Sequence, residues 1–119
     1  MRPGDNWKLP LKEYLKTDLL TTEEKQVLFS LRCREYDVKT NYKNKYEEDM
    51  TCRICREEES EEDELHTFFK CKILTHDIKI DPKTQFNHVF GSLKEQVNVM
   101  KHIMLVTRKR NIILEIRPN

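Results

Sequence analysis

Glycine and proline are scarce in this 119-residue chain, which contains only two glycines and four prolines. A turn-rich all-β fold needs more of both, so the composition argues against one. Long apolar runs are also missing, since the longest, 103–106, has four residues. A membrane-spanning helix needs about 20, and charged residues interrupt any signal-peptide-like stretch near the N-terminus. We therefore expect no membrane partner and a nuclear or cytoplasmic location.

Apolar residues are few for the chain's length: hydrophobic residues make up 37% of the sequence and charged residues 36%. Small, core-poor domains usually gain stability from a metal, a partner or disulfides. Only four cysteines are present, and nothing resembles an export signal, so we expect reduced thiols rather than disulfides.

The small net charge of +1 hides an uneven distribution of charge. Basic residues exceed acidic ones by three over residues 1–46 and by six over 66–119, whereas residues 47–65 carry ten acidic and two basic residues. Such segregation is typical of a basic face for polyanions beside an acidic surface. The simpler alternative is that 57–64 is a solvated acidic loop tip.

Apolar residues recur at helical spacing, which predicts a mostly α fold. Thr21 with Glu24 and Ser92 with Glu95 form capping boxes that open two of the helices. Asp81 and the proline after it predict a third helix start. The expected helices cover about 10–19, 22–36, from 62 onward, 82–90 and 93–117, with a loop containing a short extended piece over 37–49.

These segments form one expected domain over 1–119. It comprises N-terminal helices and a basic loop (1–49), a zinc knuckle (50–75) and C-terminal helices (80–117). In the helix that begins near residue 62, one apolar face is expected, made of Leu65, Phe68, Phe69 and Ile73.

The knuckle rests on the spacing C-x2-C-x10-H-x4-C, formed by Cys52, Cys55, His66 and Cys71. Zinc prefers four soft or borderline ligands in a tetrahedron, and three thiolates with one imidazole supply them. Four protein ligands leave no open position, so the site is expected to be structural, with one Zn²⁺.

Other assignments of these residue types stay open. Cys52 and Cys55 could form a redox pair, although no thioredoxin-like strand and helix surround them. His76, His88 or His102 could replace His66 as the fourth ligand. Cys33 is expected to be a small buried side chain.

One pattern extends over about residues 10–115. It consists of LTTEEKQVLF at 20–29, NYK at 41–43, CRIC at 52–55, DELHTFFKC at 63–71, and a tail from VF at 89–90 to RKRN at 108–111. The pattern resembles the C-terminal zinc-binding region that follows the reverse transcriptase in non-LTR retrotransposons. The resemblance implies that the knuckle residues bind zinc and that the module helps the polymerase engage RNA template or target DNA. Since no paired-aspartate polymerase motif is present, it implies an accessory fragment or a free-standing remnant.

Basic residues and a tyrosine are the candidate nucleic-acid contacts, since cations neutralise phosphates and aromatic rings stack on unpaired bases. The candidates are Arg32, Arg34, Lys39, Tyr42, Lys43, Lys45, Arg108, Lys109 and Arg110. Placement in the last turn of a helix would also explain 108–110, because cations there favour the helix dipole.

No nucleophile–histidine arrangement and no glycine-rich phosphate loop is recognisable, so we expect no enzyme. The expected function is a zinc-binding module that binds nucleic acid. The alternative is a zinc-stapled protein-interaction adaptor that uses 57–64 or the last helix.

Overall fold

The structure, a computed structural model, describes residues 14–46 and 49–116. Helices dominate it, and no strand occurs in these two ranges. Its α-helices are α2 (Thr22–Arg32), α3 (Lys43–Tyr46), α4 (Lys72–Thr75) and α5 (Leu93–Ile116); 3-10 turns form at Lys39–Asn41 and Phe86–Phe90 and a π-helical turn at His66–Lys70. The predicted mostly α fold is confirmed, and none of the described helices is long and apolar enough to cross a membrane.

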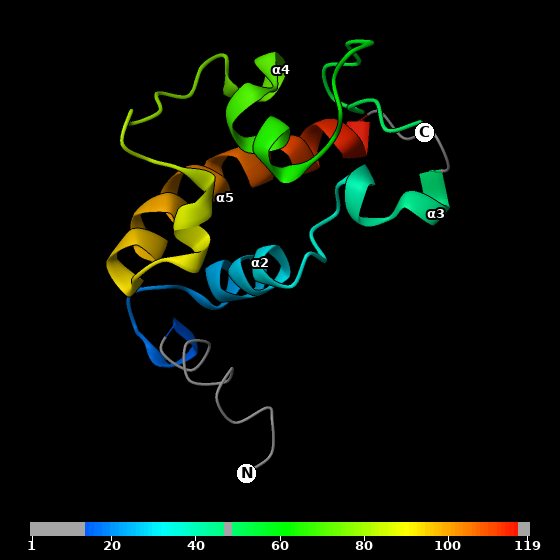
Figure 1. The fold of residues 1–119 in the computed structure, drawn as a ribbon. Helices are drawn as coiled ribbons and strands as arrows, with labels where there is room; N and C mark the ends of the chain where they lie inside the picture. The colour runs from blue at the N-terminus through cyan, green and yellow to red at the C-terminus, as the bar shows by residue number, and fades with distance from the viewer. Residues whose placement is uncertain (1–13, 47–48, 117–119) are drawn as a thin grey trace.

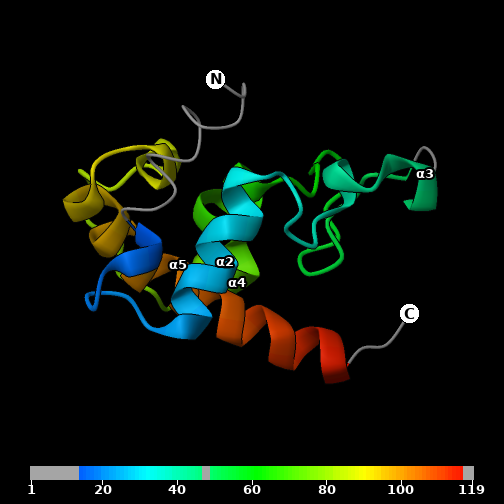
Figure 2. The same ribbon diagram turned by 90° about the horizontal axis from the view of Figure 1, so that it is seen from below.

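Helix α5 is the central element of the fold. Its 24 residues extend for about 36 Å. Helix α5 contacts α2, α4, the π-helical turn that precedes α4 and the 3-10 turn that precedes α5 (Figures 1 and 2). The expected Ser92–Glu95 capping box is present, because Ser92 N–H donates to Glu95 Oε1 at 2.9 Å and Glu95 N–H to Ser92 Oγ at 3.3 Å. The helix therefore begins where the sequence predicts.

The core lies between α5 and the elements that cover it. Met100 and Ile103 of α5 are buried, as are Leu28 of α2 and Leu74 of α4. Phe68 links the layers, with its ring 5.2 Å from that of Tyr36 and 6.2 Å from that of Phe86. The predicted apolar face from residue 62 onward is only partly correct, since Leu65 and Ile73 are exposed.

Helix α2 begins at its expected capping box, with Glu24 N–H donating to Thr21 Oγ1 at 3.1 Å. It ends at Arg32, four residues before the predicted end. Arg34 has a φ of 58°, and the N–H groups of Arg34 and Glu35 donate back to Leu31 and Ser30. This is a Schellman ending, which usually uses glycine, so the sequence contains no visible stop signal.

Two other segments differ from the prediction. Within 37–46 the chain forms the turn Lys39–Asn41 and helix α3, which were not predicted, and the expected extended piece before Met50 falls partly outside the described residues. Asp81 and Pro82 do not start a helix: Asp81 Oδ1 accepts the N–H of Lys83 at 2.9 Å, so the segment closes into a turn before the 3-10 turn at Phe86–Phe90. Residues 14–16 are helical, and the rest of the expected first helix before residue 14 lies outside the described residues.

Candidate metal centre

The first half of the site is the turn over Cys52–Cys55. Arg56 N–H donates to Cys52 O at 3.0 Å and closes the turn, which places Arg56 in the left-handed region with a φ of 57°. The backbone N–H groups of Ile54 and Cys55 donate toward the Cys52 sulfur. A tight knuckle of this kind therefore holds two sulfurs near one point and offers N–H groups to a thiolate.

The second half is the π-helical turn His66–Lys70 with Cys71 directly after it. Residues five apart in an α-helix point about 140° away from each other. The wider turn removes this offset, and Cys71 N–H donates to His66 O at 2.6 Å. The four-residue gap between His66 and Cys71 thus brings both side chains to the same side.

The four predicted ligands meet as one group. Cys52 Sγ lies 4.0 Å from Cys71 Sγ, Cys55 Sγ lies 3.4 Å from His66 Nε2, and all four ligand atoms lie within 4.8 Å of one another. Tetrahedral zinc with ordinary bond lengths separates its ligand atoms by about 3.6 to 3.8 Å. The cluster can therefore hold one metal ion.

The contact between the Cys52 and Cys71 sulfurs shifts the pKa of both thiols. The Cys52 thiol donates to Cys71, and this hydrogen bond, together with burial, raises the pKa of Cys52. The same bond lowers the pKa of Cys71. Because zinc binds thiolates, a metal would displace the thiol protons of the cluster as it binds.

One side of the site faces the core and the other faces solvent. Cys52 and Cys71 are fully buried, whereas Cys55 and His66 are half-buried. Around them, Ser60 Oγ accepts the N–H of Cys52 at 3.3 Å. Four protein ligands close the coordination shell, so this arrangement suits a structural ion and leaves no position for substrate.

The alternative ligands lie elsewhere. His88 contacts Glu95, with His88 Nε2 3.4 Å from Glu95 Oε2, and His102 donates to Phe68 O. Among the described residues, only the cluster of three cysteines and His66 forms a group able to hold a metal. Cys33 is exposed, so the expectation that it is buried is wrong: Cys33 is the C-cap residue of α2 and lies just past the helix, on the surface.

Glu62 ties the metal loop to α5. Its carboxylate is 0% exposed; Oε1 lies 2.6 Å from Arg53 Nη2 and 3.4 Å from Arg110 Nη2. Oε1 also accepts the N–H of Lys39 at 3.0 Å. The reading of 57–64 as a solvated loop tip is wrong at Glu62 and at buried Glu64, because cations from distant segments neutralise these carboxylates. We call Arg53, Glu62 and Arg110 the buried charge network.

The buried charge network also holds the segment 39–46. Thr40 N–H donates to Glu62 O at 3.2 Å, and Asn41 Nδ2 donates to Glu64 Oε2 at 2.9 Å. Arg53 Nη1 donates to Tyr46 Oη at 2.9 Å, and its guanidinium lies over the Tyr46 ring. The role of Arg53 was not predicted, because nothing near it in sequence marks it as buried.

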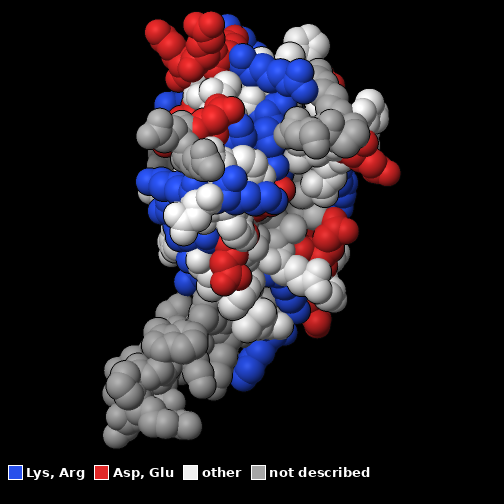
Figure 3. Space-filling view, turned by 90° about the vertical axis from the view of Figure 1, so that its right-hand side faces the viewer, with Lys and Arg blue, Asp and Glu red and all other residues white. Residues whose placement is uncertain are grey.

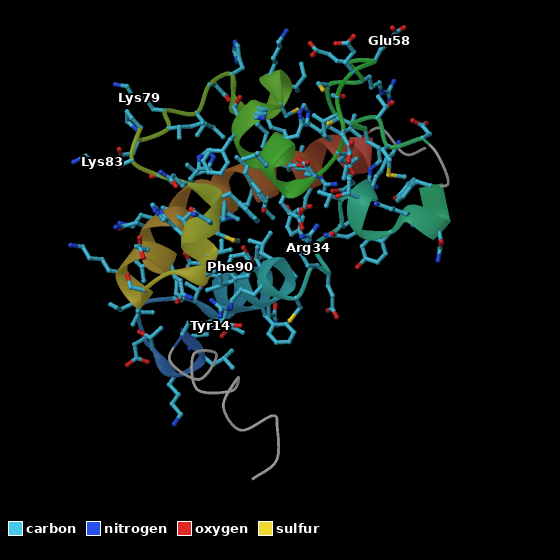
Figure 4. The ribbon with its side chains drawn as sticks, viewed as in Figure 1. Tyr14, Arg34, Glu58, Lys79, Lys83 and Phe90 are labelled. Atoms are coloured by element: carbon cyan, nitrogen blue, oxygen red, sulfur yellow. The ribbon has the colours of Figure 1, made fainter. Side chains whose placement is uncertain are left out.

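Three of the predicted nucleic-acid contacts are occupied within the protein: two are buried and Arg32 is partly buried. Arg110 and Lys39 are buried, and Arg32 donates to Val89 O at 2.7 Å beside the rings of Tyr14 and Phe90 (Figure 4). Helix α5 continues to Ile116, so 108–110 do not lie in its last turn, and the helix-dipole explanation for them is wrong.

The other candidates are solvent-accessible. Arg34 follows the C-cap of α2, and its side chain is 71% exposed. Tyr42, next to Lys43 and near Lys45 in sequence, is 41% exposed. Arg108 pairs with Glu23 at 3.5 Å, and partly buried Lys109 pairs with Asp77 at 2.6 Å.

The charge segregation of the sequence does not become a segregated surface on the face in Figure 3. Basic, acidic and uncharged side chains alternate there among the described residues. Folding brings the acidic segment against cations from elsewhere, such as Lys72, whose Nζ lies 3.1 Å from Glu57 Oε1.

Comparisons with known proteins return nothing: no family model, no curated protein and no solved structure matches this chain.

Proposed function

We propose that the cluster holds one structural Zn²⁺ and that the zinc-stapled loop fixes a single-stranded nucleic-acid contact on the segment 39–46. The observation that carries the proposal is the direct connection between the two. Glu62 and Glu64 of the loop that separates the ligand pairs bond to Lys39, Thr40 and Asn41. Any ion that orders the loop therefore also orders this segment.

The donor set supports zinc as the ion. Thiolates with one imidazole favour zinc over the hard cations, which prefer oxygen ligands. The separations of 3.4 Å and 4.0 Å match a tetrahedral shell. The hydrogen bond from Cys52 lowers the pKa of Cys71, which favours the thiolate form at that sulfur.

The surface of 40–45 supports the nucleic-acid contact. A hollow of about 470 Å³ is lined by this stretch, and Tyr42 is anchored because its Oη donates to Glu35 O at 2.7 Å. Anchoring leaves the ring face available for stacking with an unpaired base. Lys43 and Lys45, which line the same hollow, supply cations for the flanking phosphates.

The resemblance to the region after a retroelement reverse transcriptase supplies the biological setting of the proposal. In that setting the chain is an accessory that engages RNA template or target DNA, and it performs no catalysis itself.

Fluorescence anisotropy with single-stranded RNA, single-stranded DNA and duplex tests the nucleic-acid contact, after elemental analysis for one zinc per chain. The double variant Lys43→Gln/Lys45→Gln should weaken single-strand binding at least about tenfold and reduce the slope of log K against log salt by about 1.5. The matched control Lys16→Gln/Lys94→Gln removes two exposed lysines elsewhere. Equal behaviour of the two double variants contradicts the proposed contact.

The adaptor alternative has one observation of its own. Leu15, Leu19 and Phe29 are exposed, and Leu15 and Phe29 line one hollow of about 470 Å³ beside α2. Large exposed apolar side chains that cluster are typical of protein-binding surfaces. If none of the oligonucleotides binds and nuclease-treated protein still retains a partner that Phe29→Ser releases, the adaptor is the correct function.

A further inference from the structure

Two histidines that do not join the metal cluster line a separate hollow. It has a volume of about 500 Å³ and lies between the segment 79–84 and α5, with His88 and His102 in its wall. This volume is in the range of small-molecule sites. The hollow shares no residue with the metal cluster or with the segment 39–46.

Three lysines of the wall are not neutralised. Lys79, Lys83 and Lys101 are exposed, and their ammonium groups make no ion pair or hydrogen bond with any described residue. Figure 4 shows Lys79 and Lys83 extending from one loop toward the same side of the molecule, away from Glu58 and Arg34. A concentration of cations from two segments raises the local concentration of anions.

The carboxylates of the wall already have partners. Glu95 accepts from Ser92 N–H at 2.9 Å and lies 3.4 Å from His88, and Asp81 accepts from Lys83 N–H. The pKa of Glu95 is lowered, chiefly by the Ser92 N–H. These contacts hold the carboxylates to their own backbone turns and leave the lysine ammonium groups for a ligand.

His102 is the buried member of the described wall, with an exposed fraction of 8%. Its Nε2 lies 2.5 Å from Phe68 O, and since a carbonyl only accepts, Nε2 carries a hydrogen. Its Nδ1 is buried without a partner. Buried polar atoms usually have one, so the residues that line the hollow include a polar group whose hydrogen-bonding capacity is unused.

We propose that this hollow is a binding site for a phosphate group. The ammonium groups of Lys79, Lys83 and Lys101 neutralise its charge through charge-assisted hydrogen bonds. His102 lies behind these cations in the wall, and its buried Nδ1 is a polar atom there that lacks a partner. His88, Asp81 and Glu95 are the other titratable groups that face the ligand.

The test is an NMR titration of the zinc-loaded full chain at constant ionic strength. Inorganic phosphate should shift the amides of Lys79, Lys83 and Lys101 saturably, whereas chloride should not. The variant Lys83→Gln/Lys101→Gln should weaken this binding at least about tenfold, and the control Lys16→Gln/Lys94→Gln, which retains every residue of the wall, should bind normally.

Two further ligands identify the source of the phosphate. Saturable shifts with a nucleoside monophosphate place a terminal phosphate in the hollow, and shifts with an oligonucleotide that lacks terminal phosphates place a backbone phosphate there. Shifts that never saturate for any phosphate ligand, or that survive Lys83→Gln/Lys101→Gln unchanged, overturn the proposal. Neither result depends on binding at 39–46, because Lys43 and Lys45 remain intact in both double variants.

Discussion

Replacing Glu62 tests the buried charge network most directly. Glu62→Gln keeps the shape of the side chain but removes the charge that compensates Arg53 and Arg110, whose side chains are 10% and 2% exposed. Oε2 of Glu62 accepts hydrogen bonds from the backbone N–H and the Nε–H of Arg53. An amide NH2 group in that position would place a donor against these two donors. Removing one partner of a buried ion pair costs about 3–5 kcal/mol, and because one amide oxygen can still accept, we expect about 3 kcal/mol.

Urea unfolding of the zinc-loaded protein, followed by circular dichroism, measures this loss. With a slope of about 1.5 kcal/mol per molar urea, the midpoint should fall by about 2 M. Glu61→Gln is the matched control, because Glu61 is the exposed neighbour of Glu62 and its side chain makes no hydrogen bond or ion pair with a described residue. We expect that change to alter the free energy of unfolding by less than about 0.5 kcal/mol.

A double-mutant cycle shows whether the loss arises from the arginines. In an Arg110→Met background, Glu62→Gln should cost at least about 1 kcal/mol less than in the natural chain, because one uncompensated cation is gone. If Glu62→Gln is no more destabilising than Glu61→Gln, or if its cost is independent of Arg110, the buried charge network does not stabilise the fold in the way we describe.

Three other changes have defined outcomes. Cys55→Ser should reduce zinc from one ion per chain toward zero and unfold 50–75, as measured by elemental analysis and circular dichroism, whereas exposed Cys33→Ser should retain the ion. Arg34→Gly should be more stable than Arg34→Ala by about 1 kcal/mol in urea unfolding, since both changes remove the ion pair with Glu64 and a φ of 58° suits glycine; equal midpoints count against the Schellman ending. Burial raises the pKa of Tyr36 above 10.0, so stability should fall as pH rises beyond about 10, where only the unfolded chain ionises. Tyr36→Phe should make that fall shallower while costing about 1 kcal/mol at neutral pH through the lost bond to Thr107; an equally steep fall would contradict the argument.

Local signals predicted the features that depend on a few neighbouring residues. Thr21 and Ser92 start their helices because each capping box lies within four residues of sequence. The four metal ligands were predicted for the same reason, since their spacing is itself the signal. Only the structure distinguishes His66 from the other histidines, because that choice depends on the π-helical turn.

Features that depend on distant partners could not be predicted. Glu62 looks like any residue of an acidic run until Arg53 and Arg110, nine and 48 positions away, lie against it. The same contact turns Arg110 from a candidate surface cation into an interior one. The end of α2 was missed for a different reason. Arg34 adopts the left-handed backbone conformation, which is rare for arginine and which the sequence therefore does not indicate.

The π-helical turn links ligand spacing to the composition of the core. The π-helical turn contains one residue more than an α-helical turn. Helix α4 is therefore rotated about its own axis by about 100° relative to a continuous α-helix, which leaves Ile73 exposed and Leu74 buried. Deleting a single residue between His66 and Cys71 would therefore do more than misplace a sulfur. It would also exchange which side chains of α4 are buried, so the x4 spacing and the hydrophobic pattern that follows it can change only together.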